Sequence, residues 1–128
     1  MTTLSTKINL EEMTQPNVVK VITDQNKHGI YFSRFSIPYS RQELNAQTFG
    51  LAQKHVGMYG YRKRFLKLFC ETAPSSLELA ESLEQLRAIS LGAKIAVREI
   101  ESTSLGVDTP EDLLRVEDLL KLKLRLKY

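Results

Sequence analysis

Hydrophobic and polar positions in the first half of the chain predict β-strands. Residues 18–23, VVKVIT, are rich in β-branched side chains, and residues 30–35, IYFSRF, form a second run of this kind. The turn-forming sequence DQNKHG separates the two runs, which together predict a β-hairpin. A third strand is expected over residues 54–62, where His55 and Tyr59 share one face.

Helical periods dominate the second half. Residues 63–70 predict a first helix, and a second begins after Ser75, which has capping-box spacing to Glu78. Gly92 is expected to end this second helix. Its apolar stripe would consist of Leu79, Leu83 and Leu86. A fourth strand is expected over residues 93–100.

A last helix is predicted over residues 110–120, because Thr109 can cap it and Pro110 suits its first position. Strands followed by helices, then another strand and helix, predict an α/β layer. The chain lacks a glycine-rich strand-to-helix turn of the phosphate-binding kind, so it resembles the second part of a larger fold.

Composition and charge narrow the class of protein. The 128 residues are 42% hydrophobic and 26% charged, which suits one globular domain, and the net charge is +3. Four basic residues lie in the last eight, KLKLRLKY; without them the chain carries 14 basic and 15 acidic residues, so we expect no nucleic-acid partner. We therefore divide the chain into a domain over 1–120 and a basic tail over 121–128, which either forms a strand or continues the last helix.

No apolar run is long enough to span a bilayer, and the first residues lack a signal-peptide core, so no membrane partner is expected. The single cysteine, Cys70, cannot form an internal disulfide, which indicates a cytoplasmic protein. Because Cys70 ends an apolar helical run, we expect its thiol to be buried.

Two clusters of polar residues are candidate binding groups. His55 and Tyr59 flank Gly57, which would leave a shallow pit between them; the alternative is a core histidine with a satisfied ring. No second histidine or cysteine stands at zinc-ligand spacing. Glu84 and Gln85 lie either in a binding face or in an exposed helix face, where Glu84 would pair with Arg87.

Three further residues carry a charge that suits ligands. Arg34 and Arg41 could bind a carboxylate or phosphate, or form surface ion pairs. Asp108 precedes a helix that is already capped, and a fixed carboxylate there suits Mg²⁺; the alternatives are a second cap or a loop acid.

Four motifs together resemble a known family. VVKVITD…GIYFSRFSIPYSR, KHVGMYGYRKRFL, SSLELAESLEQLR and GVDTPEDLLRVEDLL are similar, in order and spacing, to the C-terminal half of the CMP-Kdo synthetases (Kdo is 3-deoxy-manno-octulosonate). The resemblance covers about residues 2–120. It implies the C-terminal half of a Rossmann-like mixed sheet flanked by helices, as in nucleotide-diphospho-sugar transferases.

The resemblance implies transfer of a cytidylyl group from CTP to Kdo, giving CMP-Kdo and pyrophosphate, with Mg²⁺ as cofactor. Asp108 matches a metal aspartate of the family. The other matching positions fall in the sugar pocket. They are His55 and Tyr59 on the strand, Glu84 and Gln85 on the helix for sugar hydroxyls, and Arg34 for the Kdo carboxylate.

The chain also departs from the family. The arginine- and lysine-bearing loop that binds the CTP phosphates and the second metal aspartate are absent. Directly after the YFSR motif, Phe35 and Ser36 stand where the family tends to have serine and proline. The chain is therefore expected to be inactive alone and to act as a homodimer or with a separate N-terminal half. We expect a gene fragment, part of a split enzyme, or a non-catalytic remnant that serves dimerisation or sugar-acid binding. The alternative without the resemblance is a small domain that associates with RNA or a membrane through its basic tail.

Overall fold

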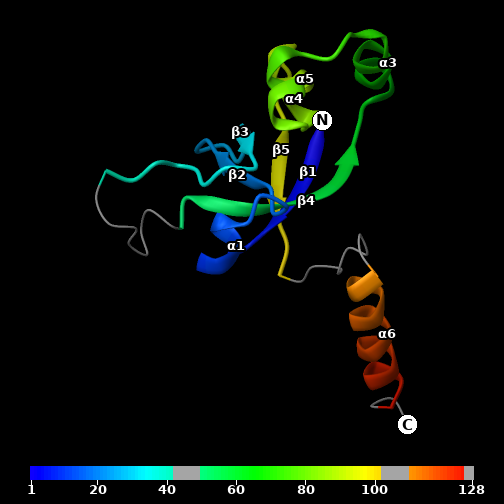
Figure 1. Cartoon of the computed structure of the whole chain (residues 1–128). Helices are drawn as coiled ribbons and strands as arrows, with labels where there is room; N and C mark the ends of the chain where they lie inside the picture. Colours follow the sequence, from blue (N-terminus) through cyan, green and yellow to red (C-terminus); the bar gives the residue numbers. More distant parts are fainter. Residues whose placement is uncertain (42–49, 102–109, 126–128) are drawn as a thin grey trace.

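A five-stranded mixed sheet organises the part of the chain that the computed structural model describes, residues 1–41, 50–101 and 110–125 (Figure 1). The strands are β1 (Thr2–Thr6), β2 (Lys20–Thr23), β3 (Gly29–Ser33), β4 (Ala52–Gly60) and β5 (Ala96–Glu99). Their order is β3-β2-β4-β1-β5, and only the β1–β5 pair is parallel. The predicted α/β class with a mixed sheet is confirmed.

The predicted hairpin is also confirmed, because β2 and β3 are antiparallel and place Val21 opposite Phe32. Asp24 fixes the connecting turn: its Oδ1 accepts hydrogen bonds from the backbone N–H groups of Asn26 and His28. This is the local bonding that favours aspartate in turns.

Strand β1 was not predicted, although it lies between β4 and β5 near the middle of the sheet. Its sequence, TTLST, contains a single apolar residue, Leu4, so hydrophobic periodicity gives no signal. Thr3 and Ser5 are nevertheless buried. Neighbouring strands on both sides supply the burial that the sequence pattern does not reveal.

The sheet separates two hydrophobic clusters, as the alternation within β2 shows. Val21 belongs to the larger cluster, together with Phe32 and Leu86, whereas the adjacent Ile22 packs against the smaller one. The smaller cluster is closed by α1 (Leu10–Thr14), which buries Met13. Helices therefore lie on both faces of the sheet, with α1 on one side and α4 and α5 on the other (Figure 1).

The helix predicted between Ser75 and Gly92 is in fact two helices, α4 (Ser76–Glu81) and α5 (Gln85–Ser90). The capping box at its start is confirmed, as is its end before Gly92, whose φ is +75°. Ser82 breaks the helix by adopting a left-handed conformation with φ 52°. The break ends the helical register, so Leu79 is 69% exposed rather than part of a buried stripe.

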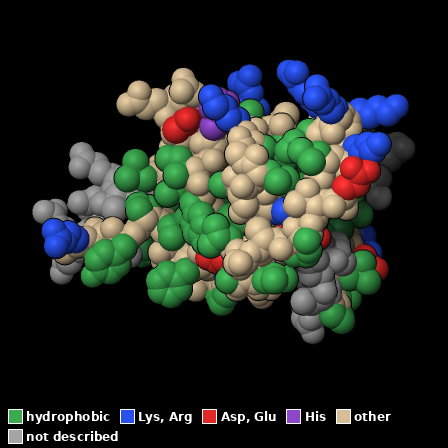
Figure 2. Space-filling model, turned by 90° about the horizontal axis from the view of Figure 1, so that it is seen from above, with side chains coloured by type: hydrophobic (Ala, Val, Ile, Leu, Met, Phe, Trp, Pro, Cys, Tyr) green, Lys and Arg blue, Asp and Glu red, His purple; other side chains and the backbone are tan. Residues whose placement is uncertain are grey.

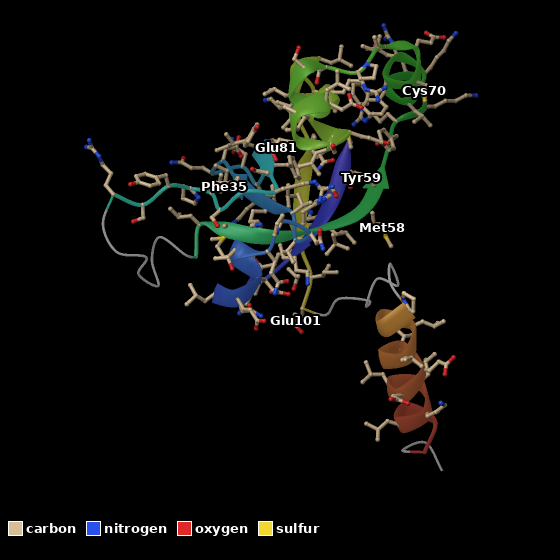
Figure 3. All side chains as sticks on the ribbon, viewed as in Figure 1. Phe35, Met58, Tyr59, Cys70, Glu81 and Glu101 are labelled. Carbon is tan, nitrogen blue, oxygen red and sulfur yellow. The ribbon has the colours of Figure 1, made fainter. Side chains whose placement is uncertain are left out.

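Helix α3 (Lys63–Glu71) buries only one narrow face, through Phe69 and in part Phe65. The prediction of a buried Cys70 was wrong, because its thiol lies on the exposed side of α3 (Figure 3). Leu66 and Leu68 are also exposed. Figure 2 views this end of the molecule, where hydrophobic and basic side chains lie side by side.

Helix α6 (Pro110–Arg125) extends past the predicted end at residue 120. The proposed boundary between residues 120 and 121 therefore falls inside a helix, and the tail follows the helical alternative as far as Arg125. Lys121 pairs with Glu117 one turn earlier, at 3.5 Å. Within the described residues, no helix combines the length and apolar character needed to cross a membrane.

A half-buried ion pair fastens α3, α4 and α5 to one another. The Arg87 guanidinium donates to both carboxylate oxygens of Glu78, at 2.6 and 2.8 Å, and to the carbonyls of Phe69 and Thr72. It also lies 4.5 Å from the centre of the Phe69 ring. The predicted pairing of Arg87 with Glu84 is therefore replaced by a pair with Glu78, nine residues away.

We expect Glu78→Gln to destabilise the fold by about 2 kcal/mol, because it leaves the Arg87 charge partly buried without its counter-charge. The free energy of unfolding in urea measures this loss. Glu71→Gln is the matched control, since the Glu71–Lys67 pair is exposed on α3 and should contribute less than about 0.5 kcal/mol. Equal losses in the two variants would contradict a structural role for the buried pair.

Candidate sugar-acid site

The candidate site lies on one face of the sheet, where β4 runs beside β1. The register places Tyr59 opposite Thr3 and His55 opposite Ser5, so these four side chains share that face. Figure 3 shows Tyr59 and Met58 on opposite sides of β4. A Cβ added to Gly57 would meet nothing within 4 Å among the described residues, so the space above this position is open.

The His55 ring is packed between aromatic neighbours and bonded at one nitrogen. Its centroid lies 5.0 Å from that of Phe32, in an edge-on arrangement, and 5.4 Å from that of Tyr59. Nε2 lies 2.9 Å from the Thr3 hydroxyl. Burial lowers the pKa of His55 to about 4, so the ring is neutral near pH 7.

Tyr59 packs beside the His55 ring on the same face of β4. Burial raises the pKa of its phenol, and the charges of Tyr61 and Glu84 raise that pKa further. The phenol therefore stays protonated and can donate a hydrogen bond. The charge of the Glu84 carboxylate also raises the pKa of Tyr61.

Gln85 is the most buried of the predicted site residues that the structure describes. Its side chain is only 3% exposed, and Nε2 has no hydrogen-bond partner among the described residues. A buried amide without a partner is costly, and such groups commonly bond to water or a ligand. Glu84, by contrast, is exposed at the start of α5. The pair therefore offers one exposed acceptor and one buried donor.

Arg34 is held by backbone carbonyls. Its guanidinium donates to the carbonyls of Pro16, Glu81 and Ser82, at 2.9 to 3.3 Å. The Arg34 backbone N–H also donates to Glu81 Oε2, which ties the end of α4 to β3. A cavity of about 600 Å³ lies beside Arg34 and is also lined by Phe35, but it contains neither His55 nor Tyr59.

The predicted metal ligand, Asp108, lies outside the described residues. Among the residues that the structure does describe, no three His, Cys, Asp or Glu side chains converge to hold a metal ion. Mg²⁺ commonly takes only one or two protein carboxylates and fills its shell with water and phosphate oxygens. One aspartate is therefore compatible with this ion when a phosphate ligand is present.

The sequence did not reveal a chain of hydrogen bonds that extends the candidate site across β1, β4 and β5. The Ser5 hydroxyl donates to Gln53 Oε1 at 3.0 Å, and Gln53 Nε2 donates to Glu99 Oε2 at 3.1 Å. These residues were overlooked because β1 was not recognised as a strand. The signal was present in the alternation of Thr3 and Ser5, which becomes informative once the strand is assigned.

The lowered pKa of His55 predicts a pH-dependent stability. Because the folded pKa is about 4 against 6.5 for an unperturbed histidine, stability is complete above pH 6.5 and declines as the pH falls toward 4. The loss should reach about 3 kcal/mol. His55→Phe removes it, whereas His28→Gln serves as the control. The free energy of unfolding in urea is measured for each protein between pH 6.5 and 4. An equal decrease of this free energy in the wild type and in His55→Phe would refute this expectation.

Comparison with known proteins identifies what the chain is similar to. A 3-deoxy-manno-octulosonate cytidylyltransferase of Bdellovibrio bacteriovorus is 51% identical over 94% of this chain and 49% of its own length. The protein of the same name from Geobacter sulfurreducens is 46% identical, over 94% of this chain and 52% of its own length. The chain thus spans about half the length of these relatives.

A solved structure agrees with these sequence matches. The structure of CMP:2-keto-3-deoxy-manno-octonic acid synthetase complexed with CTP aligns with a TM-score of 0.86 and 39% identity. The alignment covers 95% of this chain and 49% of that chain. A family model described as cytidylyltransferase matches residues 1–95. The chain belongs to the cytidylyltransferase family of nucleotidyltransferases and is related to the CMP-Kdo synthetases.

Proposed function

We propose that this chain is the C-terminal half of a CMP-Kdo synthetase and carries its sugar-acid site. The reaction would join CTP and Kdo to give CMP-Kdo and pyrophosphate, a precursor step of lipopolysaccharide synthesis in the cytoplasm. The observation that carries the proposal is the 43–51% identity to Kdo cytidylyltransferases along almost the whole chain. Four motifs that match the family's C-terminal half in order support the position within the enzyme.

The polar groups around β4 suit a ligand with many hydroxyl groups. Neutral His55, the Tyr59 phenol and the Gln85 amide provide uncharged donors and acceptors, and the Glu84 carboxylate provides a charged acceptor. Hydroxyl groups of a sugar acid can satisfy each of them. Among the described residues Gln85 Nε2 has no hydrogen-bond partner, so a ligand oxygen that reaches this buried amide would supply a missing bond.

Arg34 is proposed to meet the Kdo carboxylate with the part of its guanidinium that remains free. Among the described residues, three of its five N–H groups bond to carbonyl oxygens, and the other two are proposed to bind an anion. The carbonyl bonds would orient the guanidinium, so that little side-chain freedom is lost on binding. Arg34 would then have two roles: it would link α4 to β3, and it would bind the carboxylate end of the ligand.

Asp108 is proposed as the ligand that this chain contributes to Mg²⁺. When bound, the ion would neutralise phosphate charge and favour ionisation of the attacking sugar hydroxyl. The task of this chain's own residues would be to bind the sugar acid, orient it and exclude alternatives lacking its hydroxyls. The phosphate-binding groups for CTP would come from the other half of the enzyme.

We therefore expect the chain to be inactive alone and to associate with an N-terminal half or with a second copy. The second candidate function is that of a non-catalytic remnant that dimerises or binds a sugar acid. The same fold is expected for both candidates. The polar site retains matching residues at His55, Tyr59, Glu84 and Gln85, which supports the catalytic alternative.

Pyrophosphate release with CTP, Kdo and Mg²⁺ tests the proposal. The chain is mixed separately with the N-terminal and the C-terminal half of the Bdellovibrio relative. Activity is expected only with the N-terminal half and should be abolished by Asp108→Ala, because a metal ligand is lost. Asp118→Ala, an exposed change on α6, is the matched control and should keep activity.

Activity with the C-terminal half alone would overturn the assigned position. Activity of the chain without a partner would contradict its expected inactivity. If both halves associate with the chain but neither mixture releases pyrophosphate, the non-catalytic candidate is favoured.

A further inference from the structure

The Thr3 hydroxyl occupies a point where three polar atoms meet. Thr3 is 1% exposed, and its Oγ1 lies 3.0 Å from the Met58 carbonyl oxygen and 3.3 Å from that of Val56. The third neighbour is His55 Nε2, at 2.9 Å. Burial excludes water as a ready alternative partner, so the hydroxyl must divide its bonding among these atoms.

A hydroxyl carries a single proton, and a carbonyl oxygen can only accept one. The β1–β4 register jumps from Leu4–Val56 to Thr3–Tyr59, so Met58 has no opposite residue on β1. Its carbonyl therefore depends on Thr3 for a donor from β1. When the hydroxyl proton is directed to a carbonyl, Oγ1 presents a lone pair to His55.

This arrangement decides where the His55 ring carries its proton. A lone pair on Oγ1 requires a proton on Nε2, because two acceptors would repel each other at 2.9 Å. The pKa of His55, lowered by burial, keeps the ring neutral near pH 7. A neutral ring with Nε2–H has an unprotonated Nδ1, which is a hydrogen-bond acceptor.

We propose that Thr3 is a positioning residue that fixes His55 as the Nε2–H tautomer, so that Nδ1 accepts a hydrogen bond from a hydroxyl of the sugar acid. This inference rests on the proposed function for its ligand, but the tautomer itself is a property of the free chain. The Tyr59 phenol and Gln85 Nε2 donate, whereas Nδ1 accepts. The site therefore distinguishes ligands by the placement of hydroxyl protons as well as oxygens.

The first test measures the tautomer without any ligand. Nitrogen-15 NMR of the histidine rings at pH 7 is expected to show Nε2 protonated and Nδ1 unprotonated at His55. Assignment of the signals uses His55→Phe, which removes one ring. A His55 ring protonated at Nδ1 would overturn the proposal, whatever the ligand.

The second test compares variants of β1. Thr3→Val keeps the shape of the side chain but removes the acceptor, so the Nδ1–H form should become populated and Kdo affinity, measured by calorimetry, should fall about three- to tenfold. Thr3→Ser retains a hydroxyl and should restore both properties. Thr6→Val is the matched control, because Thr6 is buried on β1 but faces Lys54 on the other side of the sheet.

These readouts separate the two proposals. Unchanged Kdo affinity in a folded Thr3→Val chain would overturn the positioning role. If Thr3→Val does not fold, Thr3→Ser decides the matter: loss of the Nε2–H form despite a retained hydroxyl would overturn it. Absence of Kdo binding in the wild type, with the expected tautomer present, would instead overturn the proposed function.

Discussion

The hydroxyl groups of β1 impose the constraint on which the site depends. Thr3 and Ser5 are buried between two neighbouring strands, so each hydroxyl needs a partner within the protein. Those partners are side chains and carbonyls of β4, above all His55 and Gln53. Apolar side chains in these two positions would make none of these hydrogen bonds. They would leave His55 without its bond and the Met58 carbonyl without a donor from β1.

Ion-pair and hydrogen-bond contacts fix the helices that carry the other candidate residues, Glu84 and Gln85. Arg87 and Glu78 join α4 and α5 through a half-buried ion pair, and Arg34 joins α4 to β3 through carbonyl bonds. Ser82 turns the chain between the two helices, and α5 then begins with Glu84 as its N-cap and Gln85 as its first residue. The charge of Glu84 raises the pKa of Tyr59. These contacts of Arg87 and Arg34 therefore fix the end of α4 and the start of α5, where Glu84 and Gln85 lie.

The sequence predicted the parts of the fold whose signals are local. The hairpin followed from β-branched runs around DQNKHG, and the start of α4 followed from the spacing of Ser75 and Glu78. The break at Ser82 has no comparable local signal, since serine seldom adopts a left-handed conformation. The exposure of Cys70 was also missed, because a helix with several apolar residues buries only the face that meets the core.

The sequence proposes the members of the candidate site, but it does not reveal their contacts. Motif resemblance selected His55, Tyr59, Glu84 and Gln85, and the structure packs the rings of His55 and Tyr59 5.4 Å apart. The bond from Thr3 to His55 joins residues 52 positions apart and could not be read from spacing. Arg34 was selected for its charge alone, whereas its three carbonyl bonds depend on the folded positions of Pro16, Glu81 and Ser82.

The central claim is that a sugar acid binds against β4 and the start of α5. Titration of the isotope-labelled chain with Kdo, followed by NMR, tests it most directly, with acetate as a control ligand that has the carboxylate but no hydroxyls. Saturable shift changes are expected at His55, Tyr59 and Gln85 with Kdo and not with acetate. No response to Kdo, or changes confined to α3 or α6, would contradict the assignment of this face as the sugar-acid site.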